Sequence, residues 1–427
     1  MIEIKPVSTV NATVTVPGSK SLTQRALIAA ALGDGSSKLI GPLASEDTSY
    51  TSKALEQMGI TVERGDADWV VHGSGGKLAT PESEIFLGNN GTATRFLTSV
   101  VALGNGTFRI DGEERMRERP IEPLMEALQG WGVDIQSIHN TGCPPLKIES
   151  KGLTGGATVL PEGKSSQYLS SLLLVAPYAA KSATLSVKGE VFSKPYVAMT
   201  LSVMADFGVD VDCNEAFTEF SIPKGNYRAM DYRIEGDASN ASYFWAAAAI
   251  CNGRVTVANV PVPSLQGDSA LVPLLARMGC NVTRDGGGIT VDGCERLQGI
   301  SVDMADMPDV VPTLAVVAAF AHGKTEIKNI EHLRIKECDR LTATLTELAK
   351  MGAKVEEGQD YMIIHGDGGK CLHGAEIETY NDHRMAMSFA VAGLQVAGVR
   401  ITGENCVAKS FPDFWERFEL LVPESSS

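Results

Sequence analysis

The chain has 427 residues, of which 44% are hydrophobic and 21% charged, the composition of a folded globular protein long enough for two domains. Its 37 basic and 52 acidic residues give a net charge of −15, which argues against a general nucleic-acid or anionic-membrane surface and leaves room for a local basic site. The sequence shows no secretory signal, no apolar stretch that could span a bilayer and no CxxC pair among its eight cysteines. We therefore expect a cytoplasmic protein with no metal site and no membrane or nucleic-acid partner.

Six segments, taken in chain order, predict helices that are buried on nearly every side. They contain RALIAAAL, RFLTSVVAL, YLSSLLLVA, SYFWAAAAI, VPTLAVVAAF and RMAMSFAVA. Apolar residues cover almost the whole circumference of each helix, which is typical of a helix inside a protein. A turn and a strand-like run, such as RVTVANV or KTEIKNI, follow each of them.

Between these helices, five segments predict the end of a second helix followed by a strand. Each has apolar residues on one helical face, then a glycine suited to a left-handed backbone, then an alternating apolar run. The glycines are Gly59, Gly132, Gly208, Gly279 and Gly352, which recur about every 70 residues. The chain is thus predicted to contain six copies of a βαβα-type unit, the sixth without its second helix.

Each predicted buried helix begins with small or polar residues. The clusters are Lys20-Ser21, Asn89-Asn90-Gly91-Thr92, Ser165-Ser166-Gln167, Asp237-Ala238-Ser239-Asn240, Asp309 and Asn381-Asp382-His383-Arg384. N-capping explains any one cluster taken alone. Six related helices in symmetric packing, however, can bring their positive N-terminal ends to one space and attract anions there.

Basic residues lie near the same segments, in a chain with a large acidic excess. They are Lys20, Arg25, Arg95, Arg115, Arg117, Arg119, Lys194, Arg334, Lys336, Arg340, Arg384 and Lys409. Arginine matches the paired oxygens of phosphate and carboxylate, and lysine supplies a point charge. The pattern predicts a substrate with two anionic groups.

Ten segments between residues 17 and 415 together resemble one known family. They are PGSKSLTQRAL, LGNNGTATRFL, RMRERPIEPL, EGKSSQYLSSLL, SKPY, EGDASNASYF, MPDVVPTLAV, RIKECDRL, TYNDHRMAMSFA and AKSFPDFW. Their order and content are similar to the 5-enolpyruvylshikimate-3-phosphate synthases of the enolpyruvyl transferase family. The resemblance implies an α/β fold in which two domains form inside-out α/β barrels, each of three repeated βαβαββ-type units with buried helices and outward-facing sheets. The implied domains are residues 1–18 plus 237–427, on the phosphoenolpyruvate side, and residues 19–236, on the shikimate 3-phosphate side, with the active site in the cleft between them.

The implied reaction transfers the enolpyruvyl group of phosphoenolpyruvate to the 5-hydroxyl of shikimate 3-phosphate and releases phosphate, in the shikimate pathway to aromatic amino acids. It requires no cofactor, and the family resemblance implies a cytoplasmic monomer that glyphosate inhibits. By resemblance, the residues around shikimate 3-phosphate are Lys20, Ser21, Arg25, Ser165, Ser166, Gln167, Ser193, Tyr196, Asp309, His332 and Lys336. Those around phosphoenolpyruvate are Lys20, Asn89, Gly91, Arg119, Gln167, Arg340, Arg384 and Lys409.

The resemblance also assigns catalytic roles. Asp309 matches the base that takes the 5-hydroxyl proton, and Glu337 matches the residue at the methylene carbon, with Lys409 as a rival or helper in proton delivery and Lys20 beside both substrates. Local sequence alone would make Asp309 a helix cap and Glu337 a partner in a structural ion pair. Asp382 and His383 are expected to support Arg384.

The chain departs from the family pattern at three positions. His332 stands where asparagine is common, and Asn90 and Phe96 stand where alanine and proline are frequent. Because Gly91 is retained, we expect a glyphosate-sensitive enzyme.

Two other functions fit parts of the sequence. The sister transferase acting on UDP-N-acetylglucosamine carries a cysteine before its Arg-Pro dipeptide, whereas this chain reads DGEERMRERP there. A non-catalytic ligand-binding protein of the same fold would be expected to lack Asp309, Glu337 or several arginines. A nucleotide-binding enzyme is disfavoured because neither GxxxxGK[ST] nor a strand-linked GxGxxG occurs.

Overall fold

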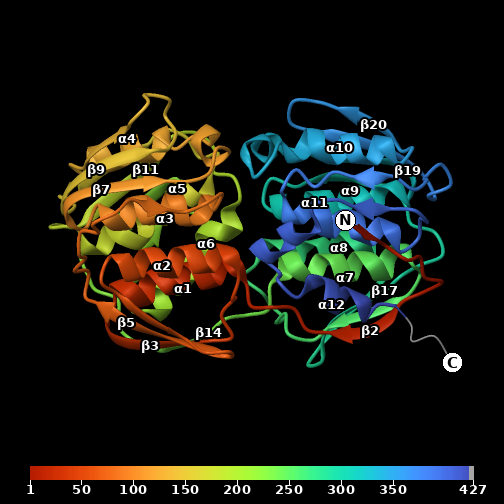
Figure 1. The fold of residues 1–427 in the computed structure, drawn as a ribbon, viewed down its shortest axis with the longest axis horizontal. Coiled ribbons are helices and arrows are strands. Elements are labelled where there is room, and N and C mark those ends of the chain that lie inside the picture. Colours follow the sequence, from red (N-terminus) through yellow and green to blue (C-terminus); the bar gives the residue numbers. More distant parts are fainter. Residues whose placement is uncertain (423–427) are drawn as a thin grey trace. The chain divides into compact units, whose positions relative to one another are not determined.

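The computed structural model describes residues 1–422, and the chain divides into two compact units. Unit 1 comprises Met1–Pro17 together with the chain from Glu235 onward, and unit 2 comprises Gly18–Ile234. Both units combine helices with strands, so the prediction of a mixed α/β protein is confirmed (Figure 1). None of the helices in residues 1–422 has the length and apolar character that crossing a bilayer requires.

Unit 2, all of whose residues are described, contains three four-stranded sheets. In spatial order these are β14 (Asp231–Arg233), β3 (Asp34–Ile40), β5 (Asp68–Ser74) and β4 (Thr61–Arg64); β6 (Ile85–Phe86), β7 (Asn105–Asp111), β9 (Leu146–Lys151) and β8 (Asp134–Ser137); and β10 (Gly156–Leu160), β11 (Ala183–Val187), β13 (Glu219–Ile222) and β12 (Asp212–Cys213). The helices are α1 (Lys20–Leu32), α2 (Glu46–Gln57), α3 (Gly91–Val101), α4 (Glu122–Gly130), α5 (Ser166–Val175) and α6 (Lys194–Asp206).

The described part of unit 1 contains two four-stranded sheets and one three-stranded sheet. In spatial order they are β16 (Asn281–Asp285), β17 (Gly288–Asp292), β15 (Arg254–Val257) and β2 (Asn11–Val14); β18 (Ser301–Asp303), β19 (His322–Lys328), β21 (Met362–Asp367) and β20 (Lys354–Glu357); and β1 (Ile2–Glu3), β23 (Arg400–Ile401) and β22 (Glu376–Ile377). Its α-helices are α7 (Ala238–Ile250), α8 (Leu271–Arg277), α9 (Val311–Ala319), α10 (Arg340–Lys350), α11 (His383–Gly393) and α12 (Phe414–Glu419).

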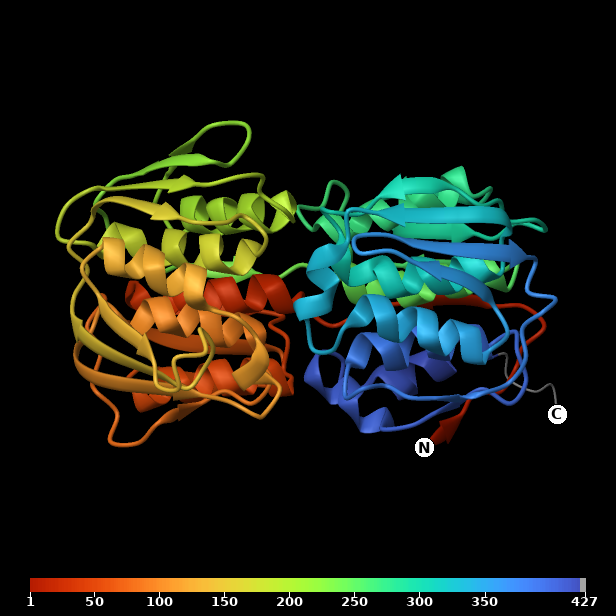
Figure 2. The ribbon, with the colours of Figure 1, turned by 90° about the horizontal axis from the view of Figure 1, so that it is seen from above.

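The six apolar helices predicted from sequence are confirmed as α1, α3, α5, α7, α9 and α11. Every residue of α7, α9 and α11 is buried, and so is nearly every residue of α1, α3 and α5. Within each unit the three buried helices contact one another. Strands such as β8 and β11 alternate between buried and exposed residues, because one face covers the helices and the other faces solvent (Figures 1 and 2).

The predicted helix stops are confirmed as well. The backbone is left-handed at all five glycines, with φ of +87° at Gly59, +85° at Gly132, +90° at Gly208, +116° at Gly279 and +93° at Gly352. A residue with a side chain is disfavoured in this conformation, which is why glycine ends each helix.

The prediction that the sixth copy lacks a second helix is wrong. The six-residue helix α12 follows β23, in the place of the longer second helices. Its aromatic residues pack together, with Phe414 and Phe418 buried and their ring centroids 5.1 Å apart. Aromatic packing therefore stabilises a helix too short to show a clear helical period in the sequence.

Three strands pair with partners far away in the sequence, and one of them is β1, which pairs with β23. Parallel pairs such as β6–β7 and β18–β19 enclose one buried helix in the sequence, as in a βαβ unit. In contrast, β2 pairs with β15, where Asn11 lies opposite Arg254, and β14 pairs with β3, where Asp231 lies opposite Lys38. The second strand of the chain, β2, thus completes a sheet of unit 1, and the last strand of unit 2 takes the edge position beside β3.

Close approach of a buried helix to a strand requires glycine in both units. A β-carbon on Gly366 in β21 would lie 2.2 Å from the carbonyl oxygen of Ala321 and 2.5 Å from that of Ala318, at the end of α9. Gly73 in β5 has the same relation to the end of α1, where a β-carbon would lie 2.3 Å from the Gly33 oxygen.

We therefore expect Gly366→Ala to lower the free energy of unfolding of unit 1 by about 1–3 kcal/mol, since neither carbonyl oxygen can move without disturbing the helix. Urea unfolding measures this change. Gly286→Ala is the matched control, because its β-carbon would meet no atom within 4 Å. Equal unfolding midpoints for the two variants would contradict the prediction.

Candidate active site

The N-terminal ends of the buried helices in unit 2 are joined by polar contacts. Lys20, the first residue of α1, forms an ion pair with Asp47 at 3.1 Å. The backbone oxygen of Asp47 accepts a hydrogen bond from the Asn90 side chain at 2.7 Å. Gln167 in α5 donates to the hydroxyl of Thr92 in α3 at 3.1 Å. These contacts place the starts of α1, α3 and α5 at the same end of the unit, where their partial positive charges add.

Arg119 lies against the start of α3 because Gly91 has no side chain. A β-carbon at position 91 would lie 2.4 Å from an Arg119 guanidinium nitrogen. That guanidinium donates to the side-chain oxygen of Asn89 at 3.1 Å and is itself buried. Arg95 donates to the carbonyl of Pro120 at 2.9 Å, which fixes the segment that carries Arg119. Three residues predicted for the phosphoenolpyruvate site are therefore in contact.

The structure tests the capping explanation helix by helix. Asn90, Asp237 and Asp382 cap α3, α7 and α11, each by accepting a hydrogen bond from a backbone N–H. Among the described residues, Ser165 and Ser193 occupy the N-cap positions of α5 and α6 without a side-chain capping hydrogen bond. Capping thus accounts for the first group, whereas the hydroxyls of Ser165 and Ser193 stand at helix N-termini without capping them.

The buried Arg25 side chain of unit 2 forms hydrogen bonds with neighbouring protein groups. Its guanidinium donates to the Thr200 hydroxyl at 2.7 Å, the Ser21 carbonyl at 2.9 Å and the Tyr196 carbonyl at 3.1 Å. It also lies 5.3 Å from the centre of the Phe96 ring. Burial lowers the pKa of Arg25 to about 10, so it stays charged at neutral pH. Arg25 thereby connects the predicted residues Ser21 and Tyr196.

In unit 1, Asp309 lies between two buried arginines. Its carboxylate accepts from Arg340 at 3.0 Å and from Arg384 at 2.5 Å. Asp309 belongs to the short 3-10 turn Pro308–Val310 before α9, and in residues 1–422 the side-chain cap of α9 is missing. The alternative of Asp309 as the cap of α9 is therefore wrong, because Val310 holds the N-cap position and the Asp309 carboxylate pairs with two arginines.

Arg340 contacts two further carboxylates. It donates to Asp382 at 2.7 Å and to Glu337 at 2.7 Å, and Lys409 lies 3.9 Å from the other Glu337 oxygen. Although burial opposes its charge, the three carboxylates hold the pKa of Arg340 above its ordinary value. Asp382 also accepts from the backbone N–H of Arg384 at 2.9 Å. The expected support of Arg384 by Asp382 is present, and Asp382 supports Arg340 as well.

His332 and Lys336 lie in or next to the 3-10 turn Glu331–Ile335. Burial lowers the pKa of His332 to about 3, and the charge of Lys336 acts in the same direction while Asp309 opposes it. The ring is therefore neutral at physiological pH. A neutral imidazole offers one N–H donor and one acceptor nitrogen.

Sequence reasoning missed three residues next to these groups. Asp47 lies in the first turn of α2, outside the six helix-start clusters, and pairs with Lys20. The Tyr243 hydroxyl accepts from Arg384 at 3.4 Å. Burial raises the pKa of Asp268 to about 7, with Asp309 adding to the effect and Arg384 opposing it, and the Ser239 hydroxyl donates to the Asp268 carboxylate. None follows a motif, because only folding brings them to the site.

Two other basic residues pair with carboxylates outside the predicted site. Arg115 pairs with the exposed Glu118 at 2.9 Å, a surface pair that contributes little to stability. Arg117, which is half exposed, pairs with the buried Asp111.

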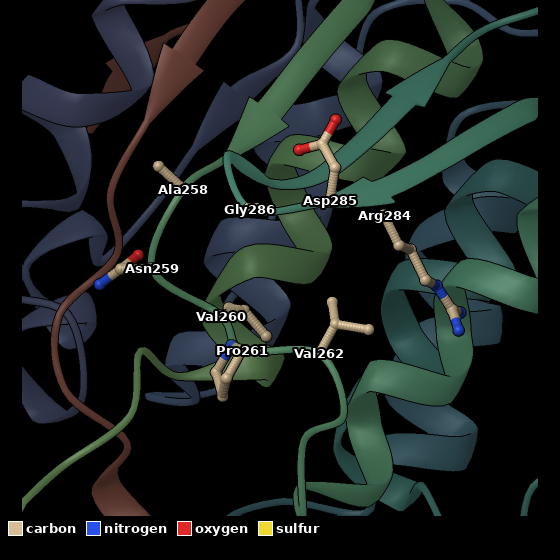
Figure 3. Close-up of a pocket in the computed structure, with 9 residues that line it drawn as sticks. Ala258, Asn259, Val260, Pro261, Val262, Arg284, Asp285 and Gly286 are labelled. Atoms are coloured by element: carbon tan, nitrogen blue, oxygen red, sulfur yellow. The ribbon is translucent and has the colours of Figure 1, made fainter.

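A hollow of about 450 Å³ lies elsewhere in unit 1, between the loop after β15 and the β16–β17 turn. Figure 3 shows that the Arg284 and Asp285 side chains beside it point in different directions. Its described lining residues include none of those predicted for the site. A ligand site needs polar groups that converge, so this hollow is not the candidate site.

Residues 1–422 also hold no cluster of three or more His, Cys, Asp and Glu side chains placed to bind a metal ion. The arrangement offers instead buried cations for anionic ligands and carboxylates for proton transfer.

The neutral state of His332 predicts a pH effect on stability. Its pKa is about 3 in the folded chain against an ordinary 6.5, so the unfolded chain binds more protons between these pH values. The stability that His332 contributes is complete above pH 6.5 and is lost as the pH falls toward 3. Urea unfolding of the wild type and of His332→Asn at several pH values should show their difference changing across this window. Parallel pH profiles would contradict the prediction.

Known proteins of one family are similar to this chain over nearly its whole length. The sequence profile of the family described as EPSP synthase (3-phosphoshikimate 1-carboxyvinyltransferase) matches residues 4–418. A 3-phosphoshikimate 1-carboxyvinyltransferase of Trichormus variabilis is 47% identical over 416 residues, covering 97% of each chain, and one of Shewanella amazonensis is 44% identical over 426 residues, covering 99% of each. A solved EPSP synthase structure from Acinetobacter baumannii has a TM-score of 0.82 at 29% identity and covers 98% of both chains. The resemblance inferred from ten sequence segments is confirmed, and this chain belongs to the EPSP synthase family, the 3-phosphoshikimate 1-carboxyvinyltransferases.

Proposed function

We propose that this carboxyvinyltransferase of the shikimate pathway binds and activates its substrates with the two sets of residues described above. Phosphoenolpyruvate and shikimate 3-phosphate are the substrates of the family. The observation that carries the assignment is Asp309, a carboxylate at a helix start that is held by Arg340 and Arg384 instead of capping the helix.

Unit 2 is proposed to hold shikimate 3-phosphate. The hydroxyls of Ser165, Ser166 and Ser193 stand at or next to helix N-termini, where backbone N–H groups and the helix dipole favour a phosphate. Lys20 adds a cation at the start of α1, and the buried Arg25 fixes Ser21 and Tyr196. Three hydroxyls recognise a phosphate without activating it for cleavage, which suits a group that the reaction leaves in place.

Phosphoenolpyruvate is proposed to bind Arg119, Arg340 and Arg384, with Lys20, Asn89, Gly91, Gln167 and Lys409 around it. Each guanidinium can donate two parallel hydrogen bonds to a phosphate or a carboxylate. Gly91 leaves room for Arg119 against the start of α3, where an alanine would displace the guanidinium.

Substrate binding itself is proposed to activate the base. Arg340 and Arg384 stabilise the charged form of Asp309 while they contact it. When they donate to phosphoenolpyruvate instead, Asp309 loses two cationic partners and its pKa rises. The carboxylate can then take the 5-hydroxyl proton as the oxygen bonds to C2 of phosphoenolpyruvate. Glu337, 3.9 Å from Lys409, is placed to give a proton to the methylene carbon as the new C–O bond forms, with help from that lysine. A proton then returns from that carbon as phosphate leaves and the C2–C3 double bond forms again.

The barrel architecture, the substrate that each domain binds, the cellular location and the oligomeric state are also proposals. We propose that each unit is an inside-out α/β barrel, which the complete burial of α7, α9 and α11 supports. We further propose that residues 19–236 act mainly on shikimate 3-phosphate, that residues 1–18 and 237–427 act mainly on phosphoenolpyruvate, and that the enzyme is a cytoplasmic monomer without a cofactor.

The function is tested by mixing the purified chain with phosphoenolpyruvate and shikimate 3-phosphate and measuring phosphate release. UDP-N-acetylglucosamine serves as the competing acceptor, and a preference for it would refute the proposal. In the same assay, we expect Asp309→Asn to lower kcat by about 10²-fold or more, because the amide cannot accept the proton. Asparagine keeps the size and the hydrogen-bond acceptor of aspartate, so a folded variant with wild-type kcat would remove Asp309 from the base role.

The phosphoenolpyruvate subsite is tested by Arg119→Ala. We expect the KM for phosphoenolpyruvate to rise about tenfold or more and the KM for shikimate 3-phosphate to change far less, since one charge-assisted contact is lost. Glyphosate should compete with phosphoenolpyruvate in the wild type and lose affinity in this variant. The reverse order of KM effects would mean that the subsites are misassigned, and wild-type inhibition only at millimolar glyphosate would refute sensitivity.

A further inference from the structure

The loop between β22 and α11 carries the site residue Asp382 in an unfavourable backbone conformation. Tyr380 has φ +52° and Asn381 has φ +53°, so two consecutive residues with side chains are left-handed. Such a conformation is unfavourable for a residue with a side chain and persists only where surrounding contacts hold it. The next residue, Asp382, caps α11 and receives Arg340.

Helix α10 holds this loop at two points. At its N-terminus, Arg340 donates to Asp382 at 2.7 Å. Two turns later, Glu347 accepts from the Tyr380 hydroxyl at 2.7 Å and from the backbone N–H of Glu378 at 3.1 Å. Positions 340 and 347 are seven residues apart and therefore lie on the same face of the helix.

Glu347 is a buried charge with an unusual set of partners. Its side chain is fully buried, whereas that of its cationic partner Lys350 is 41% exposed. Lys350 lies 2.8 and 2.9 Å from the two carboxylate oxygens. Burying a carboxylate costs several kcal/mol unless its oxygens are satisfied. Here Lys350 compensates the charge of Glu347, and the carboxylate oxygens also accept hydrogen bonds from the loop residues Glu378 and Tyr380.

We propose that Glu347 is a positioning residue for the phosphoenolpyruvate site, which it serves by clamping residues 378–382 so that Asp382 presents Arg340 and Arg384 correctly. It contacts the loop and not the substrate. Without the clamp, Tyr380 and Asn381 can relax from the left-handed region, and Asp382 moves with them. Asp382 orients the Arg340 guanidinium and bonds the backbone N–H of Arg384, so both arginines are displaced together.

This inference rests on the proposed role of Arg340 and Arg384 in binding phosphoenolpyruvate. The test measures kcat and the KM of both substrates for Glu347→Ala, Glu347→Gln and Tyr380→Phe. We expect Glu347→Ala to raise the KM for phosphoenolpyruvate about tenfold, because a displacement of order 1 Å can cost up to about 10²-fold in rate. The KM for shikimate 3-phosphate should stay within about twofold of wild type. Glutamine keeps one acceptor oxygen for the loop, so Glu347→Gln should recover part of the loss.

Two controls separate positioning from general loss of stability. Leu348→Ala removes a buried side chain from the same helix, and it should lower the unfolding midpoint while leaving the ratio of the two KM values unchanged. Thr346→Ala changes an exposed neighbour of Glu347 and should leave both KM values unchanged. If Leu348→Ala shifted the KM ratio as much as Glu347→Ala does, the effect would be structural and the proposal would fail.

Tyr380→Phe keeps the test decisive even if Glu347→Ala fails to fold. Removing only the Tyr380 hydroxyl should raise the KM for phosphoenolpyruvate. A double variant that combines Tyr380→Phe with Glu347→Gln or Glu347→Ala should change KM by less than the two single effects multiplied, since both substitutions break the same contact. Arg340→Ala distinguishes the two proposals. If Arg340→Ala raises the KM for phosphoenolpyruvate and the Glu347 and Tyr380 variants do not, only the proposed role of Glu347 is refuted. If Arg340→Ala has no such effect, the proposed subsite itself is refuted.

Discussion

A buried guanidinium surrounded by three carboxylates is the interaction on which the rest of unit 1 depends. Arg340 contacts Asp309, Glu337 and Asp382, and these residues come from different segments of the chain. Removing one partner from such a buried cluster leaves an uncompensated charge and costs several kcal/mol. The 3-10 turn before α9, the start of α10 and the start of α11 are therefore tied to one another by a single side chain.

The same cluster explains how a site rich in cations exists inside a folded protein. Arg340, Arg384 and Lys409 are balanced by the same three carboxylates through ion pairs. In the proposed function, an anionic substrate that takes over the arginines frees carboxylates, and a freed carboxylate attracts a proton. Binding of one substrate and activation of the base would then be two consequences of one exchange of partners. In unit 2, the proposed phosphate site uses backbone amides and hydroxyls at helix ends, as suits a phosphate that is recognised and not transferred.

Local rules predicted where some of the candidate residues lie in the fold. Ser165 and Gly91 were expected in clusters at helix starts, and the structure places each at the start of a helix. Their roles toward the substrates came from the family resemblance and remain proposals. Local sequence alone offered a helix cap as the alternative role of Asp309. In the structure Val310 stands at the N-cap of α9, and Asp309 pairs with two arginines that are distant in the sequence. Local rules state which partners a side chain can have, and tertiary packing decides which of them are within reach.

By itself, the sequence determined the six buried helices, the left-handed glycine that ends each second helix in five copies, and the charged residues at helix starts. Each follows from hydrophobic period, backbone sterics or helix electrostatics within one or two turns of chain. Only the tertiary structure decided that β2 pairs with β15 while β14 pairs with β3, and that Asp47 and Glu347 support site residues. These contacts join segments that are distant in the sequence, and no local hydrophobic pattern relates them. They can form and stabilise the protein only once each unit has packed.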